Sequence, residues 1–241
     1  MIQDKAEFVK TLTKDLPAPP KYFFHDAKLN QEGPSVLFED AFKKVKNPLK
    51  VEDFEKFVAE NVPIIDTRHL AEGGLIKGSF WISLKAMICQ LISRVLDPST
   101  PFALVVDEGT ETEVIERLLR IGFYNILGYN GFNMKEWKGE TVKPLLRTYE
   151  TIESTKKTIF IDVRNKPEWE EGGVFENALL LALPDFKSKI DLVIEMVNKH
   201  PDADVIVHCK TGMRARLATS ILCNHLTCQI SVLNEVFEKL P

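Results

Sequence analysis

The feature that most constrains this chain is a short apolar run, residues 205–207, which leads into a cysteine and then into a helix-forming stretch. Cys209 is followed by a single glycine, Gly212, and by two arginines, Arg214 and Arg216. A strand that ends in such a loop before a helix is typical of parallel α/β sheets, whose functional loops lie at the carboxyl ends of strands. The helix N-terminus and the loop N–H groups would face the sulfur of Cys209 and favour the nucleophilic thiolate.

The chain also repeats itself at a spacing of roughly 100 residues, which is the size of a domain. The matching pairs are residues 64–68 and 160–164, 72–75 and 171–174, 104–106 and 205–207, and, more loosely, 126–127 and 231–233. Their apolar runs are continuous, as expected for strands buried on both faces. Apolar residues at helical spacing fall between them, within residues 84–95, 114–119 and 186–197. The prediction is an α/β fold of two tandem domains, each a mainly parallel sheet flanked by helices.

These repeats divide the chain into three predicted parts. The first domain covers residues 48–147, and the second covers residues 148–241. Residues 1–47 are expected to form a short helix and then an extended arm, because prolines cluster at residues 17–20 and disfavour a helix there. Two interpretations of the arm remain open: it lies across a partner surface, or it is a linker.

Composition argues against several classes of function. The 241 residues are 44% hydrophobic and 27% charged with a net charge of −4, which suits a globular protein and gives no basic field for nucleic acid. No apolar run is long enough to span a membrane. The four cysteines are irregularly spaced, so we expect a reducing compartment, the cytoplasm or the mitochondrial matrix, rather than a disulfide framework. The N-terminal residues show no targeting signal.

Three motifs of the second repeat resemble the rhodanese, or sulfurtransferase, family. They are Asp-Val-Arg at residues 162–164, Glu-Trp at residues 168–169, and the Cys-x-x-Gly-x-Arg loop at residues 209–214. The resemblance implies that Cys209 is catalytic and carries sulfane sulfur as a persulfide. The donor would be thiosulfate or a persulfide such as glutathione persulfide, and the acceptor would be a thiol. The resemblance implies no cofactor and no metal.

The resemblance also assigns roles to the residues around the cysteine. The substrate-binding residues would be the rest of the loop, namely Lys210, Thr211, Gly212, Met213 and Arg214. Within this set, Lys210 and Arg214 would attract an anionic donor.

Four further residues would support the loop. Asp162 and Arg164 are expected to form an ion pair or turn clamp at a strand end. His208 would tune the cysteine or, the favoured interpretation, bond to a neighbouring backbone group. Arg216 would assist the loop or remain a cation on the helix surface.

Other interpretations of the cysteines remain open. Cysteine phosphatases place their arginine at the sixth residue after the cysteine, where this chain has Ala215, so the spacing favours sulfur transfer. A buried, inert cysteine at a strand end is the second alternative. Cys223, His225 and Cys228 fit no zinc spacing well, and packing is the favoured role for them.

The first repeat differs at the corresponding loop. Residues 107–113 contain no cysteine and carry four carboxylates, which belong to Asp107, Glu108, Glu111 and Glu113. Negative charge and the lack of a nucleophile argue against persulfide chemistry there, so the first domain would be structural or a contact surface.

An acidic first repeat before a cysteine-bearing second repeat is similar to the C-terminal part of fusion proteins that join a metallo-β-lactamase-fold persulfide dioxygenase to two rhodanese domains. The resemblance implies a protein partner on the N-terminal arm, either a separately encoded persulfide dioxygenase or a larger complex. Two departures stand against full activity: Gly-Gly-Val replaces the usual Gly-His-Ile at residues 172–174, and residues 233–237 lack the closing Gly-Gly turn and Trp. The alternative to an active sulfurtransferase is therefore a retired accessory or structural subunit of a larger, possibly mitochondrial, complex.

Overall fold

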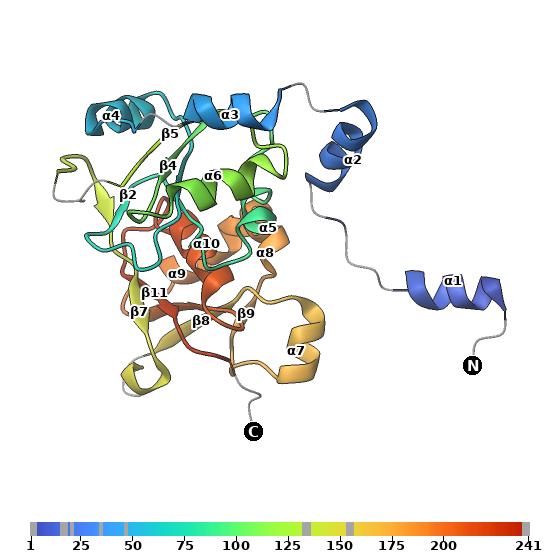
Figure 1. Cartoon of the computed structure of the whole chain (residues 1–241). Helices are drawn as coiled ribbons and strands as arrows, with labels where there is room; N and C mark the ends of the chain where they lie inside the picture. The colour runs from blue at the N-terminus through green and yellow to red at the C-terminus, as the bar shows by residue number, and fades with distance from the viewer. Residues whose placement is uncertain are drawn as a thin grey trace.

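The computed structural model of the chain describes residues 4–14, 19, 22–33, 36–45, 48–131, 136–152 and 157–237. Two parallel sheets lie at its centre (Figure 1). The first has the order β3-β1-β4-β5, formed by Phe80–Trp81, Ile64–Asp66, Phe102–Val105 and Ile126–Asn130. The second has the order β7-β11-β10-β8-β9, formed by Leu145–Arg147, Ile230–Leu233, Asp204–His208, Thr158–Asp162 and Leu179–Leu180. The predicted α/β fold with parallel sheets is confirmed.

The two sheets share one strand order. The strands β1, β3, β4 and β5 of the first sheet take the places that β8, β9, β10 and β11 take in the second. All pairings within both sheets are parallel, whereas β2 (Leu75–Ile76) and β6 (Thr141–Val142) form a separate antiparallel pair. We call the first sheet with its helices the first unit, and the second sheet with its helices the second unit.

Helices cover both sheets. The first unit contains α3 (Phe38–Val45), α4 (Val51–Ala59), α5 (Ile88–Ile92) and α6 (Glu111–Leu119). The second contains α7 (Lys166–Gly172), α8 (Leu183–Phe186), α9 (Ile190–Asn198) and α10 (Met213–Leu222). Two of the predicted helices are shorter than their apolar pattern. Only α5 is helical within residues 84–95, and a 3-10 turn, Lys187–Lys189, separates α8 from α9. Outside α5, Leu84 and Val95 are half-buried and Met87 is exposed, so the apolar pattern there does not mark one buried helix face.

The N-terminal part corrects the predicted arm. A short helix forms as expected, α1 (Lys5–Thr13), and it stands away from the rest of the molecule with no buried residue (Figure 1). Residues predicted to be extended instead form a second helix, α2 (Tyr22–Glu32), because no proline or glycine interrupts them. Pro17 and Pro20 lie outside the described residues. Because α3 buries Ala41 and Val45 in the core, the first unit begins before residue 48.

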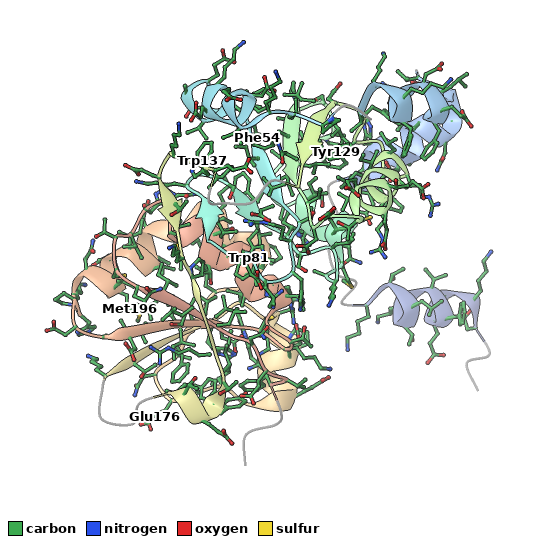
Figure 2. The ribbon with its side chains drawn as sticks, turned by 60° about the vertical axis from the view of Figure 1, so that its left-hand side comes forward. Phe54, Trp81, Tyr129, Trp137, Glu176 and Met196 are labelled. Carbon is green, nitrogen blue, oxygen red and sulfur yellow. The ribbon has the colours of Figure 1, made fainter. Side chains whose placement is uncertain are left out.

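Each face of the first sheet has its own core, as β4 illustrates. Phe102 and Leu104 point into the large core that continues into the second unit. Ala103 and Val105 point to the other face, into a smaller core with Phe54 of α4. Figure 2 shows Phe54 and Trp137 on this outer side of the first unit, and Trp81 near its boundary with the second. This alternation along a fully buried strand is the ordinary side-chain geometry of a sheet with helices on both faces.

Helix α10 lies between the two units (Figure 1). All residues from 215 to 222 are buried, so the helix has no solvent-facing stripe. Its polar side chains bond to the first unit instead. Ser220 Oγ accepts a hydrogen bond from the Trp81 backbone N–H at 3.0 Å, and Asn224 Oδ1, just beyond the helix, accepts one from Gly78 N–H at 2.9 Å. The helix therefore belongs to the core of both units.

No helix in the described part of the chain is both long enough and apolar enough to cross a membrane.

Neighbouring residues of α10 provide a test of this packing. Ser220→Ala should lower the free energy of unfolding by about 1–3 kcal/mol, because it leaves the buried Trp81 N–H without an acceptor. Thr219 is equally buried, but its hydroxyl has no hydrogen-bond partner among the described residues, so Thr219→Val should be neutral or stabilising. Urea unfolding of both variants measures the difference, and equal losses would contradict this account.

Candidate functional site

Cys209 lies directly after β10, and residues 210–212 separate it from α10, as the strand–loop–helix pattern predicts. The turn into the helix is made by Gly212, whose φ of 79° lies in the left-handed region. A Cβ at this position would come within 3.0 Å of the Leu233 carbonyl oxygen and 3.2 Å of Asn234 Cα. Glycine is therefore required both by the backbone angle and by the close approach of the chain that follows β11.

The residues after β11 contact both the cysteine loop and the His208 side chain. The Phe237 N–H donates to the Lys210 carbonyl oxygen at 2.7 Å. The Phe237 ring stacks on the imidazole of His208 at 5.2 Å and lies 3.9 Å from the guanidinium carbon of Arg164. The second repeat lacks the Trp-containing closing turn of the first. In the first unit Trp137 packs in the smaller core with Phe54, whereas Phe237 packs against His208 and Arg164. Sequence reasoning missed Phe237, since nothing in the local pattern distinguishes it from any C-terminal aromatic residue.

Asp162 and Arg164 form the expected clamp. The guanidinium of Arg164 donates to both carboxylate oxygens of Asp162 at 2.6–3.0 Å, and it also donates to the carbonyl oxygens of Glu168 and Gly173. Both clamp side chains are buried, so the bidentate geometry and the extra acceptors compensate for their desolvation. The clamp ties the end of β8 to α7 and to the turn that follows α7.

The first unit contains the same clamp. Arg68 donates to both oxygens of Asp66 and to the carbonyl oxygens of Glu72 and Gly74. The predicted correspondence of the two Asp-x-Arg motifs therefore extends to individual hydrogen bonds.

Arg214 does not stand free over the cysteine. Its guanidinium donates twice to the Glu168 carboxylate, with both distances at 2.7 Å. These hydrogen bonds lower the pKa of Glu168, so the pair is ionised at neutral pH. For Arg214, burial lowers the pKa, but the contacts with Glu168 and Cys209 outweigh it and raise the pKa overall. The Glu-Trp motif located Glu168, but its partner was visible only in the fold.

His208 points away from the cysteine side of the sheet. The Cys209 side chain packs in the large core with Val205 and Val207, so His208, the residue between Val207 and Cys209, faces the opposite side. There the imidazole lies among Phe160, Phe175 and Phe237.

Burial lowers the pKa of His208 to about 4; Arg164 adds to this effect and Asp162 opposes it. The backbone of Cys209 is near enough to raise the pKa to a small extent. Neither ring nitrogen forms a hydrogen bond of ordinary geometry within the described residues, and Nε2 lies 3.6 Å from Asp162 Oδ2. The expected bond to a neighbouring backbone group is therefore limited to the weak contact with Cys209. His208 is therefore a neutral, buried support beneath the loop.

Arg216 is fully buried, which rules out the interpretation of a surface cation. Its Nη1 donates to the carbonyl oxygen of His69 at 2.8 Å, and its Nη2 donates to Asn234 Oδ1 at 2.8 Å. The guanidinium carbon lies 4.9 Å from the Trp81 ring centroid, which adds a cation–π contact. Arg216 thus links the first turn of α10 to both the first unit and the chain after β11.

Four of the predicted substrate-binding residues line one cavity. Lys210, Thr211, Met213 and Arg214 form the second unit's side of a space of about 370 Å³. Cys209 is only 1% exposed and is not among the residues that line this cavity. The structure therefore brings the loop residues together at an accessible surface while it keeps the cysteine behind them.

The other cysteines form no metal centre. No cluster of three or more histidine, cysteine, aspartate or glutamate side chains suited to a metal ion occurs in the described ranges, and these include Cys223, His225 and Cys228. Burial raises the pKa of the Cys223 thiol to about 12, so it is protonated at neutral pH.

Comparison with known proteins finds a family match for the second unit. Residues 147–240 match the family model of the rhodanese-like domain. A tRNA uridine(34) hydroxylase of Pectobacterium carotovorum subsp. carotovorum (strain PC1) is 32% identical over 68 residues, covering 28% of this chain and 19% of that protein. The chain thus spans less than a fifth of the length of the curated relatives it matches.

Two solved structures are also similar. A metallo-β-lactamase of Staphylococcus aureus subsp. aureus COL is 26% identical with a TM-score of 0.38, covering 54% of this chain and 35% of that one. A thiosulfate sulfurtransferase of Pseudomonas aeruginosa is 14% identical with a TM-score of 0.32, covering 79% and 38%. The overall agreement with both structures is low.

The turn at Gly212 gives one test of the loop. Gly212→Ala should lower the free energy of unfolding by about 1–3 kcal/mol more than Gly109→Ala. Both glycines have positive φ, but a Cβ at Gly109 meets nothing within 4 Å, so the difference isolates the contact with residues 233–234. Chemical denaturation of the two variants measures this difference in unfolding free energy. Indistinguishable midpoints would show that a Cβ at residue 212 does not destabilise the fold through residues 233–234.

The buried imidazole gives a second test. His208 has a pKa of about 4 in the fold and about 6.5 when unfolded, so the unfolded state binds more protons between these values. The stability that neutral His208 gives the fold is fully present above pH 6.5. As the pH falls to 4, the free energy of unfolding decreases by about 3 kcal/mol. His208→Phe keeps an aromatic ring among its aromatic neighbours and should remove this loss. Unfolding free energies of both proteins between pH 4 and pH 7 test it; parallel pH curves would refute it.

Proposed function

Residues 147–240 form a rhodanese-like domain, and from this we propose that the chain is a sulfurtransferase that carries sulfane sulfur as a persulfide on Cys209. The observation that carries the proposal is the position of Cys209 between the end of β10 and the start of α10, with Gly212 making the turn. A loop of this kind directs backbone N–H groups and the positive helix end toward an anionic sulfur.

The proposed reaction has two steps. The Cys209 thiolate attacks the outer sulfur of thiosulfate or of an organic persulfide, and the donor's sulfur–sulfur bond breaks to release sulfite or a thiolate. An acceptor thiolate then attacks the outer sulfur of the Cys209 persulfide, which returns the cysteine to its thiolate form. Both steps exchange one sulfur–sulfur bond for another, so neither needs an external oxidant or reductant. Lys210 would attract the anionic donor, and Arg214 would do so within its pair with Glu168.

We further propose that the first unit is a second rhodanese-like domain without chemistry of its own. Its strand order and its Asp66–Arg68 clamp, which match those of the second unit, support this assignment. Its loop has carboxylates in place of the nucleophile, and it would therefore act by holding α10 through Ser220 and Arg216.

A second candidate is an accessory subunit with no turnover. It is favoured by the 1% exposure of Cys209 and by an exposed apolar face on α1, formed by Phe8, Val9 and Leu12. Such a face, isolated from the rest of the molecule, suits contact with another protein. We do not extend the hydroxylation named for the matched relatives to this chain, because it covers less than a fifth of them and its net charge of −4 does not favour RNA.

Intact mass spectrometry distinguishes the two candidates. Reduced protein incubated with thiosulfate or glutathione persulfide should gain one sulfur atom, about 32 Da, and Cys209→Ser should not. Cys223→Ser is the matched control, because burial keeps that thiol protonated and its loss should leave the gain intact. A folded wild-type protein that gains no sulfur with either donor would overturn the sulfurtransferase proposal and leave the accessory role.

A further inference from the structure

Arg216 is a buried cation whose side-chain partners are all neutral. Its side chain is fully buried. The guanidinium donates to the His69 carbonyl oxygen at 2.8 Å, to His69 Nδ1 at 3.2 Å, and to Asn234 Oδ1 at 2.8 Å. No aspartate or glutamate among the described residues forms an ion pair with it. A buried charge without an opposite charge nearby is strongly unfavourable, so this guanidinium requires an anionic partner.

Two carboxylates that contact neighbouring residues bond to other groups. Asp107 Oδ2 accepts from the backbone N–H of His69 at 2.9 Å, and both oxygens of Glu168 accept from Arg214 at 2.7 Å. The arginine of the loop motif is thereby neutralised, whereas Arg216 is not. The Nε–H of Arg216 also has no acceptor among the described residues. Arg216 therefore keeps its full charge and one unused donor.

The guanidinium of Arg216 lies against the cysteine loop. Asn234 Oδ1, which accepts its hydrogen bond, is only 3.2 Å from the position that a Cβ would take at Gly212. The Arg216 backbone N–H donates to the Gly212 carbonyl oxygen at 3.1 Å. Cys209 begins this loop, and its side chain packs in the large core to which α10 also belongs. Burial lowers the pKa of Arg216, and Cys209 is the group that opposes this shift.

The first unit holds this guanidinium in place. Arginine has only donors, so His69 Nδ1 must accept, and the His69 ring is neutral with its proton on Nε2. Burial, Arg216 and Lys85 lower the pKa of His69, whereas Asp107 opposes them. The Trp81 ring centroid lies 4.9 Å from the guanidinium carbon and adds a cation–π contact. His69 and Trp81 thus fix the cation without neutralising it.

We propose that Arg216 is the counter-ion of the Cys209 thiolate, and that His69 of the first unit is a positioning residue that holds the guanidinium beside the cysteine loop. The charge that stabilises the sulfur is then carried by α10 but oriented by the unit that has no nucleophile. The inference deepens the proposed sulfurtransferase function, which needs the thiolate. It concerns ionisation alone, however, and is measured without a sulfur donor.

The first experiment titrates the Cys209 thiolate in the full chain. Its ultraviolet absorbance is followed over a pH series as the difference between each protein and the same protein with Cys209→Ser. Arg216→Gln should raise the midpoint of this titration by about one pH unit, because it removes an opposite charge. Arg216→Lys keeps the charge and should restore most of the shift. The matched control, Arg120→Gln, removes an exposed cation and should leave the midpoint unchanged. Equal midpoints in wild type and Arg216→Gln would overturn the proposal.

A double variant tests which arginine balances the sulfur. Arg214→Gln/Glu168→Gln removes a pair whose charges cancel, so it should move the midpoint less than Arg216→Gln does. A larger shift in the double variant would assign the counter-ion role to Arg214 and overturn the proposal.

The second experiment tests the positioning role of His69, which is only half-buried and so tolerates substitution. His69→Leu removes the acceptor for Arg216 Nη1 and should raise the same midpoint, though less than Arg216→Gln does. His69→Gln offers another acceptor and should restore the wild-type midpoint. Equal midpoints in His69→Leu and wild type would refute the positioning role. If Arg216→Gln does not fold, this pair of variants decides the proposal.

Titration and sulfur gain separate this inference from the proposed function. Midpoints that shift as expected in a protein that gains no sulfur would refute the sulfurtransferase function alone. A protein that gains sulfur on Cys209, but whose thiolate titrates at the same pH with and without Arg216, would refute the counter-ion role alone.

Discussion

The burial of α10 between the two units is the constraint on which the rest of the structure depends. A helix with no solvent-facing side must satisfy its polar groups internally, and here Arg216 and Ser220 do so through the first unit. The cysteine loop is continuous with the N-terminus of this helix, so any shift of the first unit moves the loop. The first unit is therefore part of the same core, which no single unit completes alone.

The cysteine loop is fixed a second time, from the opposite side of the sheet. Phe237 bonds to the loop backbone at Lys210 and packs against His208 and Arg164. Arg164 in turn is tied to Asp162 and to the turn after α7. Because burial lowers the pKa of His208 to about 4, the imidazole in this support stays neutral at neutral pH. These contacts of Phe237 come from the segment that lacks the closing Gly-Gly turn and Trp of the first repeat.

The loop does not bind anions simply through a free arginine. The arginine of the motif is already paired with Glu168, and that pair fixes its position more than it attracts a ligand. Among the described residues, Lys210 in the loop and Lys85 and Arg94 on the first-unit side of the adjoining cavity contribute positive charge that no ion pair neutralises. The two units thus differ in charge as well as in packing: the second unit carries Cys209 and its loop, and the first carries two of the cations that line the cavity beside that loop.

The sequence by itself determined the local features: the strands, the loop between β10 and α10, the repeat, and the two Asp-x-Arg clamps, because these depend on contacts within short segments. Only the tertiary structure decided that Arg216 points into the first unit, that Glu168 pairs with Arg214, and that His208 faces away from the cysteine. It also placed α3 in the core and Phe237 beneath the loop. Each of these depends on which surfaces meet across long sequence separations, and residue spacing carries no information about that.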